Sequence, residues 1–235
     1  MYGAISSMVL NAVGGPYVPV DGDALVHADF VAEVYEVGGA PSSLAAMFSG
    51  TDPTGFSASG MTVGYDSANR PMLAGAAFAA IAEGLSDGIT LLFELDGLPG
   101  DTILFVGDHD EIGEETEYLW LTSQPGAENR TTLSFGSNTL PTNDFGINRI
   151  AFSFSRDLGG GTWRHALSVN GSTVSTSGDH YQEVAYSIGA YLEHVGTIEI
   201  GGSQSWGYTN DNEAFRKFIA YPAMDDAALS ALTAL

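Results

Sequence analysis

The sequence of 235 residues lacks cysteine and has few basic side chains. Without cysteine no disulfide can brace the fold and no thiol chemistry is available. Seven basic residues, among which Lys217 is the single lysine, face 29 acidic residues and leave a formal charge of −22. A nucleic acid needs cations to neutralise its phosphates, and an anionic membrane surface would repel this chain. Both classes of partner are therefore excluded.

The acidic excess has two interpretations that the sequence leaves open. One is solubility, with salt screening the self-repulsion, and the other is divalent-cation binding by acidic loops. The densest such loop, residues 108–117, holds six carboxylates and one histidine. Asp108, Asp110 and Glu111 are its predicted calcium ligands, although the loop lacks EF-hand spacing and a purely solvated loop explains it as well.

Long apolar runs are missing too. No stretch approaches the roughly 20 residues of a membrane span, so membrane insertion is not expected. The apolar segment at residues 8–13 has no basic residues before it and does not resemble a secretory leader. We expect residues 1–27 to form an N-terminal arm that docks on a partner, and residues 28–235 to form one domain.

Turn-forming residues punctuate the chain, with 30 glycines and nine prolines, and the segments between them suit strands. Asn170-Gly171 is the strongest hairpin signal, because both central residues of a type I′ turn need positive φ. The expected strands are residues 30–36, 89–96, 102–106, 118–122, 131–135, 147–155, 166–169, 173–176, 197–200 and 214–221. So many short strands predict two antiparallel sheets packed as a sandwich.

Two segments depart from the strand pattern. Residues 74–85 are rich in alanine and suit either a short helix or a strand with a small-residue face. Residues 225–235 predict a helix, because Pro222 ends the strand before it, Asp225 can cap it, and three leucines share one helical face.

The C-terminal half carries a resemblance to a known superfamily. Residues 198–202 (IEIGG), 215–222 (FRKFIAYP) and 224–233 (MDDAALSALT) resemble the closing segments of concanavalin A-like, or laminin G-like, domains. Residues 166–176, around the Asn-Gly pair, resemble a strand pair of that family. The resemblance covers residues 28–235 and implies an all-β, two-sheet antiparallel jelly-roll sandwich with a short C-terminal helix.

The N-terminal half resembles something narrower. Residues 28–30 (ADF), 43–48 (SLAAMF) and 56–63 (FSASGMTV) resemble the opening of virion proteins from tailed phages and gene transfer agents. That opening ends in an Asp-x-x-Gly turn, and here residues 66–69 (DSAN) take its place, with Asn69 in the position of the glycine. The arginine that the family usually has in the segment before this turn is missing. The resemblance implies a non-enzymatic structural or decoration protein (head spike, fibre or tail component), assembled in the bacterial cytoplasm into the virion. Its expected partners are other virion subunits, its own copies and host-surface polysaccharide.

A stand-alone bacterial carbohydrate-binding module is the alternative function. Both functions would use the loop at residues 203–212, whose aromatic rings can stack on sugar faces while its amides meet the hydroxyls. The predicted glycan- or partner-binding residues are Gln204, Trp206, Tyr208, Asn210, Asp211 and Asn212. A buried Trp206 that plugs the end of the sandwich is the competing interpretation.

Catalysis is not expected. Glu94 and Asp96 would share a strand face, and the segment resembles the catalytic strand of β-glucanases with this fold. Retaining hydrolysis needs two carboxylates about 5–5.5 Å apart. The second glutamate of that family is absent, since residues 97–100 (GLPG) form a turn instead. No G-x-S-x-G motif occurs, and the five histidines show no metal-binding spacing.

Overall fold

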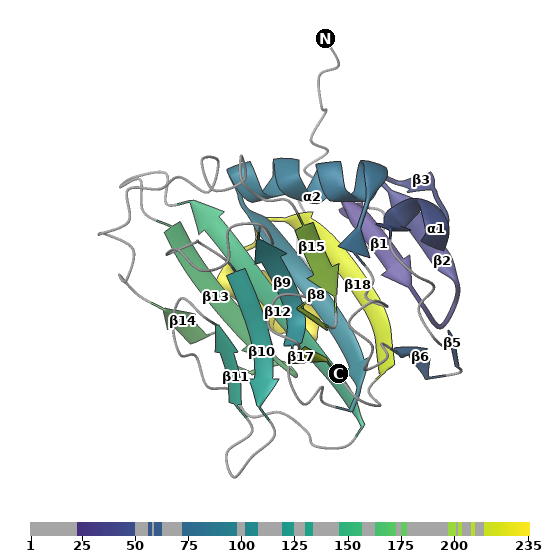
Figure 1. Ribbon diagram of the computed structural model, residues 1–235. Coiled ribbons are helices and arrows are strands. Elements are labelled where there is room, and N and C mark those ends of the chain that lie inside the picture. The colour runs from purple at the N-terminus through teal and green to yellow at the C-terminus, as the bar shows by residue number, and fades with distance from the viewer. Residues whose placement is uncertain are drawn as a thin grey trace, which may run out of the picture.

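Two antiparallel sheets face each other in the computed structural model, as the sequence predicts (Figure 1). Between them lies one hydrophobic core, so the fold is an all-β, two-sheet jelly-roll sandwich with a short C-terminal helix. The structure describes residues 23–49, 56–57, 59–62, 72–97, 102–107, 119–124, 130–133, 146–156, 163–172, 175–177, 197–200, 202–203, 208–209 and 214–235.

The larger sheet has the strand order β14-β13-β12-β8-β18-β1-β2-β3, with the β5–β6 hairpin attached to β18. Its long central strands, β8 and β12, pair along their full overlap and match the predicted segments closely. The bounds are β1 Val26–Asp29, β2 Val34–Val37, β3 Ala40–Pro41, β5 Phe56–Ser57, β6 Gly60–Thr62, β8 Ile89–Asp96, β12 Ile147–Arg156, β13 Trp163–Val169, β14 Ser175–Ser177 and β18 Ala214–Pro222.

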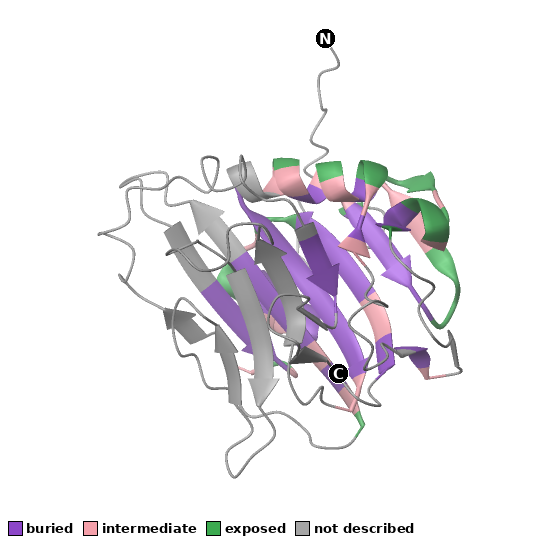
Figure 2. Ribbon diagram, viewed as in Figure 1, coloured by how far each residue is buried: buried purple, intermediate pink, exposed green. Residues whose placement is uncertain are grey.

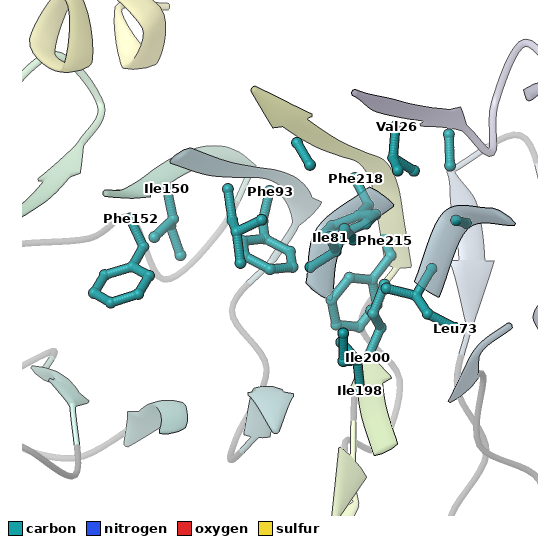
Figure 3. Packing of buried hydrophobic residues seen from close by; sticks show 14 of the residues in the cluster. Val26, Leu73, Ile81, Phe93, Ile150, Phe152, Ile198, Ile200, Phe215 and Phe218 are labelled. Carbon is teal, nitrogen blue, oxygen red and sulfur yellow. The ribbon is translucent and has the colours of Figure 1, made fainter. Parts of the chain in front are cut away.

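The smaller sheet has the order β11-β10-β9-β15-β7-β4. Its bounds are β4 Phe48–Ser49, β7 Met72–Leu73, β9 Thr102–Gly107, β10 Leu119–Gln124, β11 Arg130–Leu133 and β15 Thr197–Ile200. Ile198 and Ile200 of β15 point into the core between the sheets. Figure 3 shows them beside Phe215 of β18. Figure 2 shows that β8 and β1 are buried along nearly all their length, whereas burial of β18 is interrupted by a half-buried stretch, Arg216 and Lys217.

The alanine-rich segment is a helix, α2 Gly75–Asp87, which settles the choice that the sequence left open. It lies across one end of the sandwich (Figure 1). Ala77 and Ile81 reach the core from this end, so the helix closes it against water. A short helix, α1 Leu44–Met47, precedes β4 and is capped by the Ser43 hydroxyl.

The strand predicted at residues 30–36 is wrong in its first half. Residues 30–33 form a turn between β1 and β2, and Glu33 has a φ of 56°. The cause is Asp29, whose Oδ1 accepts hydrogen bonds from the backbone N–H of Val31 at 3.0 Å and of Ala32 at 2.8 Å. An aspartate that bonds the backbone two and three residues on reverses the chain. The predicted domain boundary at residue 28 falls inside β1.

The C-terminal helix, α4 Asp226–Thr233, packs on the outer face of β12 and β13. Asp225 caps it as predicted, since its Oδ1 accepts from the Ala228 N–H at 2.8 Å. Leu229 and Leu232 are buried, together with Leu92 of β8, in a second apolar cluster. The larger sheet is therefore covered on both faces along these strands.

Candidate functional site

The predicted binding loop is built on a two-stranded hairpin. β16 (Gly202–Ser203) pairs with β17 (Tyr208–Thr209), and Ser203 lies opposite Tyr208. The hairpin follows β15 and contacts β9, and β17 lies on the side of β15 away from α2 (Figure 1). Of Tyr208 the structure describes the backbone, and the other predicted binding residues lie outside the described residues: Gln204, Trp206, Asn210, Asp211 and Asn212.

The predicted calcium ligands, Asp108, Asp110 and Glu111, also lie outside the described residues. Among the residues that are described, no group of three or more histidine, aspartate or glutamate side chains could hold a metal ion. No helix in this part of the chain is long and apolar enough to cross a membrane.

Glu94, the glutamate of the β-glucanase-like segment, is held between two arginines. Its Oε2 accepts from Arg149 Nε at 2.9 Å, and its Oε1 accepts from Arg216 Nε at 3.1 Å. The Glu94 side chain is only 9% exposed, and Asp96 lies two residues on, at the half-buried end of β8. Both oxygens of Glu94 are thus occupied by charge-assisted hydrogen bonds, the stronger kind in proteins.

Four charged side chains of alternating sign stand in one row across the larger sheet, on its outer face. Asp29 of β1 lies opposite Lys217 of β18, Lys217 opposite Glu94 of β8, and Glu94 opposite Arg149 of β12. Lys217 Nζ is 3.0 Å from Asp29 Oδ2. Opposite charges facing each other across antiparallel strands stabilise the pairing and oppose a shift of register.

A β-bulge brings a third cation into this row. The register of β18 against β8 shifts between Phe215 and Lys217, so Arg216 is the extra residue. Phe215 and Phe218 both point into the core. Arg216 and Lys217 between them therefore share the outer face, where strict alternation would have placed them on opposite faces. The bulge is what lets Arg216 reach Glu94.

The neighbours of Asp29 in this row and in the adjoining turn change the pKa of its carboxyl group. Its side chain is nearly buried, and burial raises the pKa of a carboxyl. Hydrogen bonds from the Ala32 and Val31 N–H groups, together with the Lys217 ammonium, outweigh that effect and lower the pKa below its usual value of 3.8. Asp29 is therefore held as a carboxylate.

We name Glu94, Arg149 and Arg216 the arginine cluster. The sequence pattern did not predict that these three residues meet. One signal was available, because residues 216–217 are the single adjacent pair of basic residues in a chain with seven. The pairing of Arg149 with Glu94 depends on strand register across 55 residues, which no local pattern gives.

The fold is similar to that of known saccharide-processing proteins, although no protein-family model and no curated protein matches the sequence. Trypanosoma rangeli sialidase in complex with 2,3-difluorosialic acid aligns with 15% identity and a TM-score of 0.60, over 93% of this chain and 34% of that chain. The same sialidase with sialic acid aligns with 15% identity and a TM-score of 0.58, over 93% and 33%.

A smaller neighbour is the Ruminococcus gnavus IT-sialidase CBM40 bound to α2,3-sialyllactose. It has 17% identity and a TM-score of 0.47, over 66% of this chain and 87% of that chain. The chain spans about a third of the Trypanosoma rangeli sialidase. The likeness to that sialidase shows the fold, a β-sandwich jelly roll.

Proposed function

We propose that this chain is a non-catalytic carbohydrate-binding domain. The observation that carries the proposal is the β16–β17 hairpin, which fixes Ser203 opposite Tyr208. In the sequence, residues 204–207 join these two strands and include Gln204 and Trp206. A stacking ring beside amide groups is the combination that sugars need, because apolar C–H faces alternate with hydroxyl edges around the ring.

The neighbouring structures add support from the fold. The Trypanosoma rangeli sialidase is in complex with sialic acid, and it aligns over 93% of this chain. A jelly roll presents several loops at each end of the sandwich, and loops carried by a rigid scaffold are common binding positions. The carbohydrate-binding alternative is therefore preferred to the virion function.

The non-catalytic part of the proposal rests on Glu94. A retaining glycosidase needs one carboxyl that gives a proton to the leaving oxygen and another that attacks the sugar. Arg149 and Arg216 occupy both oxygens of Glu94, and the side chain is buried among them. A carboxylate held this way supports the strands and is poorly placed to exchange protons with a substrate.

Glycan binding by purified protein tests the proposal. Wild type, a Trp206→Ala/Tyr208→Ala double variant and a Ser205→Ala variant of the same hairpin would be titrated with a panel of bacterial surface polysaccharides, with calcium and with chelator. We expect binding by wild type and Ser205→Ala and its loss in the double variant. Calcium dependence that is lost when Asp108, Asp110 and Glu111 are replaced would place these predicted ligands in the site.

No saccharide bound by wild type would overturn the proposal, whereas equal binding by the double variant would overturn the assignment of the site to the hairpin. The virion role stays a prediction, because none of the three solved structures named above is a virion protein. Its first test is whether the full chain, but not one lacking residues 1–22, assembles with other virion subunits. That truncation leaves β1 intact.

A further inference from the structure

We propose that the arginine cluster is a carboxylate-binding site, and that the saccharide ligand carries an isolated acidic group. This inference rests on the proposed function and names the class of saccharide. The cluster is notable in so acidic a chain, because it gathers basic residues where few exist. Three of the seven basic residues in the sequence, Arg149, Arg216 and Lys217, lie together in the row across β1, β18, β8 and β12, on a chain with a formal charge of −22.

Each guanidinium group has N–H donors that do not bond Glu94. Each contacts Glu94 through Nε alone, one oxygen each, so neither planar fork is used up by that carboxylate. Arg149 Nη1 also donates to the Ala234 carbonyl at 2.8 Å. Among the described residues, the two Nη groups of Arg216 have no hydrogen-bond partner. A guanidinium carries five N–H donors in a fixed fork, so Arg216 retains four.

These donors are accessible and their directions are fixed. The Arg149 side chain is 35% exposed and that of Arg216 is 24% exposed, whereas Glu94 beneath them is 9% exposed. The buried carboxylate holds the Nε of each guanidinium, and each arginine side chain keeps part of its surface in solvent. An incoming carboxylate would meet a preorganised donor pair and would lose little further side-chain entropy on binding.

The local charge is nearly balanced, in contrast to the strongly acidic remainder of the chain. Three cations in the row face the carboxylates of Asp29 and Glu94, and Asp96 lies two residues beyond Glu94 on the same strand face. The rest of the chain repels anions, but at physiological salt that repulsion is screened beyond about 8 Å. A densely charged polyanion would still meet acidic surface along its length. An oligosaccharide with a single carboxylate would not, so the site fits sparsely charged acidic glycans.

Matched pairs of saccharides test the inference. The panel holds oligosaccharides that carry one uronate or one sialate group, each beside its carboxyl-reduced, neutral counterpart. The proteins are wild type, Arg216→Gln, Arg216→Lys and Arg130→Gln. Arg130 begins β11 of the smaller sheet, so its variant removes the same charge from the other layer. Thermal unfolding of each variant confirms that it is folded.

We expect wild type to bind at least one acidic member about tenfold or more tightly than its reduced counterpart, as the loss of a charge-assisted hydrogen bond implies. Arg216→Gln should abolish that preference and Arg216→Lys should restore part of it, while Arg130→Gln keeps it. Equal binding of acidic and reduced members by wild type, or an unchanged preference in Arg216→Gln, overturns the carboxylate site and leaves the carbohydrate proposal standing. No binding of any saccharide overturns both.

Discussion

The Thr233 hydroxyl, in the last turn of α4, lies 2.8 Å from the Ser168 hydroxyl of β13. Thr233 is fully buried, and its Oγ1 also accepts from the Gly171 N–H at 3.0 Å. One side chain thus ties the C-terminal helix both to the body of the larger sheet and to the β13–β14 turn. Apolar packing of Leu229 and Leu232 brings the helix to this face, and these hydrogen bonds fix where along the strands it sits.

Replacing Thr233 with valine should destabilise the fold by about 1–3 kcal/mol. Valine keeps the shape, but the buried Ser168 hydroxyl loses its partner on the helix and the Gly171 N–H loses its acceptor. Ser230→Ala is the control, because Ser230 bonds the same turn from a more exposed position and should cost about 1 kcal/mol or less. Urea midpoints measured at constant m-value compare the two, and a wild-type midpoint for Thr233→Val contradicts the claim.

Asn170 should be separable into a backbone effect and a side-chain effect. Its φ is 51°, its Oδ1 accepts from the Arg149 N–H at 2.9 Å, and its Nδ2 donates to Asn148 Oδ1 at 2.9 Å. Asn170→Gly keeps the positive φ and loses the side-chain bonds, for about 1–2 kcal/mol. Asn170→Ala should cost about 1–2 kcal/mol more, since alanine is strained there. Equal unfolding free energies for the two variants would exclude the backbone effect.

Local chemistry explains which parts of the fold could be predicted from the sequence. The Asn170-Gly171 turn and the Asp225 cap each depend on residues within a few positions of one another, and both are confirmed. The turn at residues 30–33 was missed because the alternating apolar pattern there looked like a strand. The decisive group was the Asp29 side chain just before it.

Long-range register explains what could not be predicted. The segment around Glu94 resembles an enzyme strand, yet the partners of its carboxylate are 55 and 122 residues away in the sequence. Arg216 reaches Glu94 because of the bulge in β18, and no periodicity in the sequence of that strand predicts the extra residue. A site assembled across strands becomes visible only when the pairing is known.

Acid should weaken the Asp29–Lys217 pair. The folded-state pKa of Asp29 lies below its usual value of 3.8, so this carboxylate contributes stability above that value. The contribution is lost as pH falls through the lower, folded-state pKa. Lys217→Met removes one cause of the lowering, so its destabilisation relative to wild type should shrink between about pH 6 and about pH 2. Chemical unfolding at several pH values measures this, and a pH-independent difference contradicts it.

Glu94→Gln should affect stability rather than hydrolysis. The amide offers one acceptor to two guanidinium donors, and its NH₂ group opposes the second. We expect a loss of about 1–3 kcal/mol, less than for a fully buried pair because both arginines reach solvent. Reducing-end assays on polysaccharides should show no turnover by wild type or variant. Turnover by wild type that disappears in Glu94→Gln would reverse the non-catalytic proposal.

His27 contrasts with Thr233: both side chains are buried and polar, but we expect the burial of His27 to lower the stability of the fold. It is 6% exposed, and neither imidazole nitrogen has a hydrogen-bond partner within the described part of the chain. Glu36 Oε2 lies 3.8 Å from Nδ1, beyond hydrogen-bonding distance. His27→Leu replaces these nitrogens with apolar atoms of similar bulk, so it should leave stability unchanged or raise it by about 1 kcal/mol.

Thr90→Val is the matched comparison for His27→Leu. The Thr90 hydroxyl is equally buried but satisfied, since it donates to Ser153 Oγ and accepts from the Met224 N–H, both at 3.1 Å. Its removal should cost about 1–3 kcal/mol. The two variants therefore change buried polarity in the same sheet and should move the urea midpoint in opposite directions. If both lower it equally, the His27 imidazole is hydrogen-bonded in the folded protein, and its burial carries no penalty to relieve.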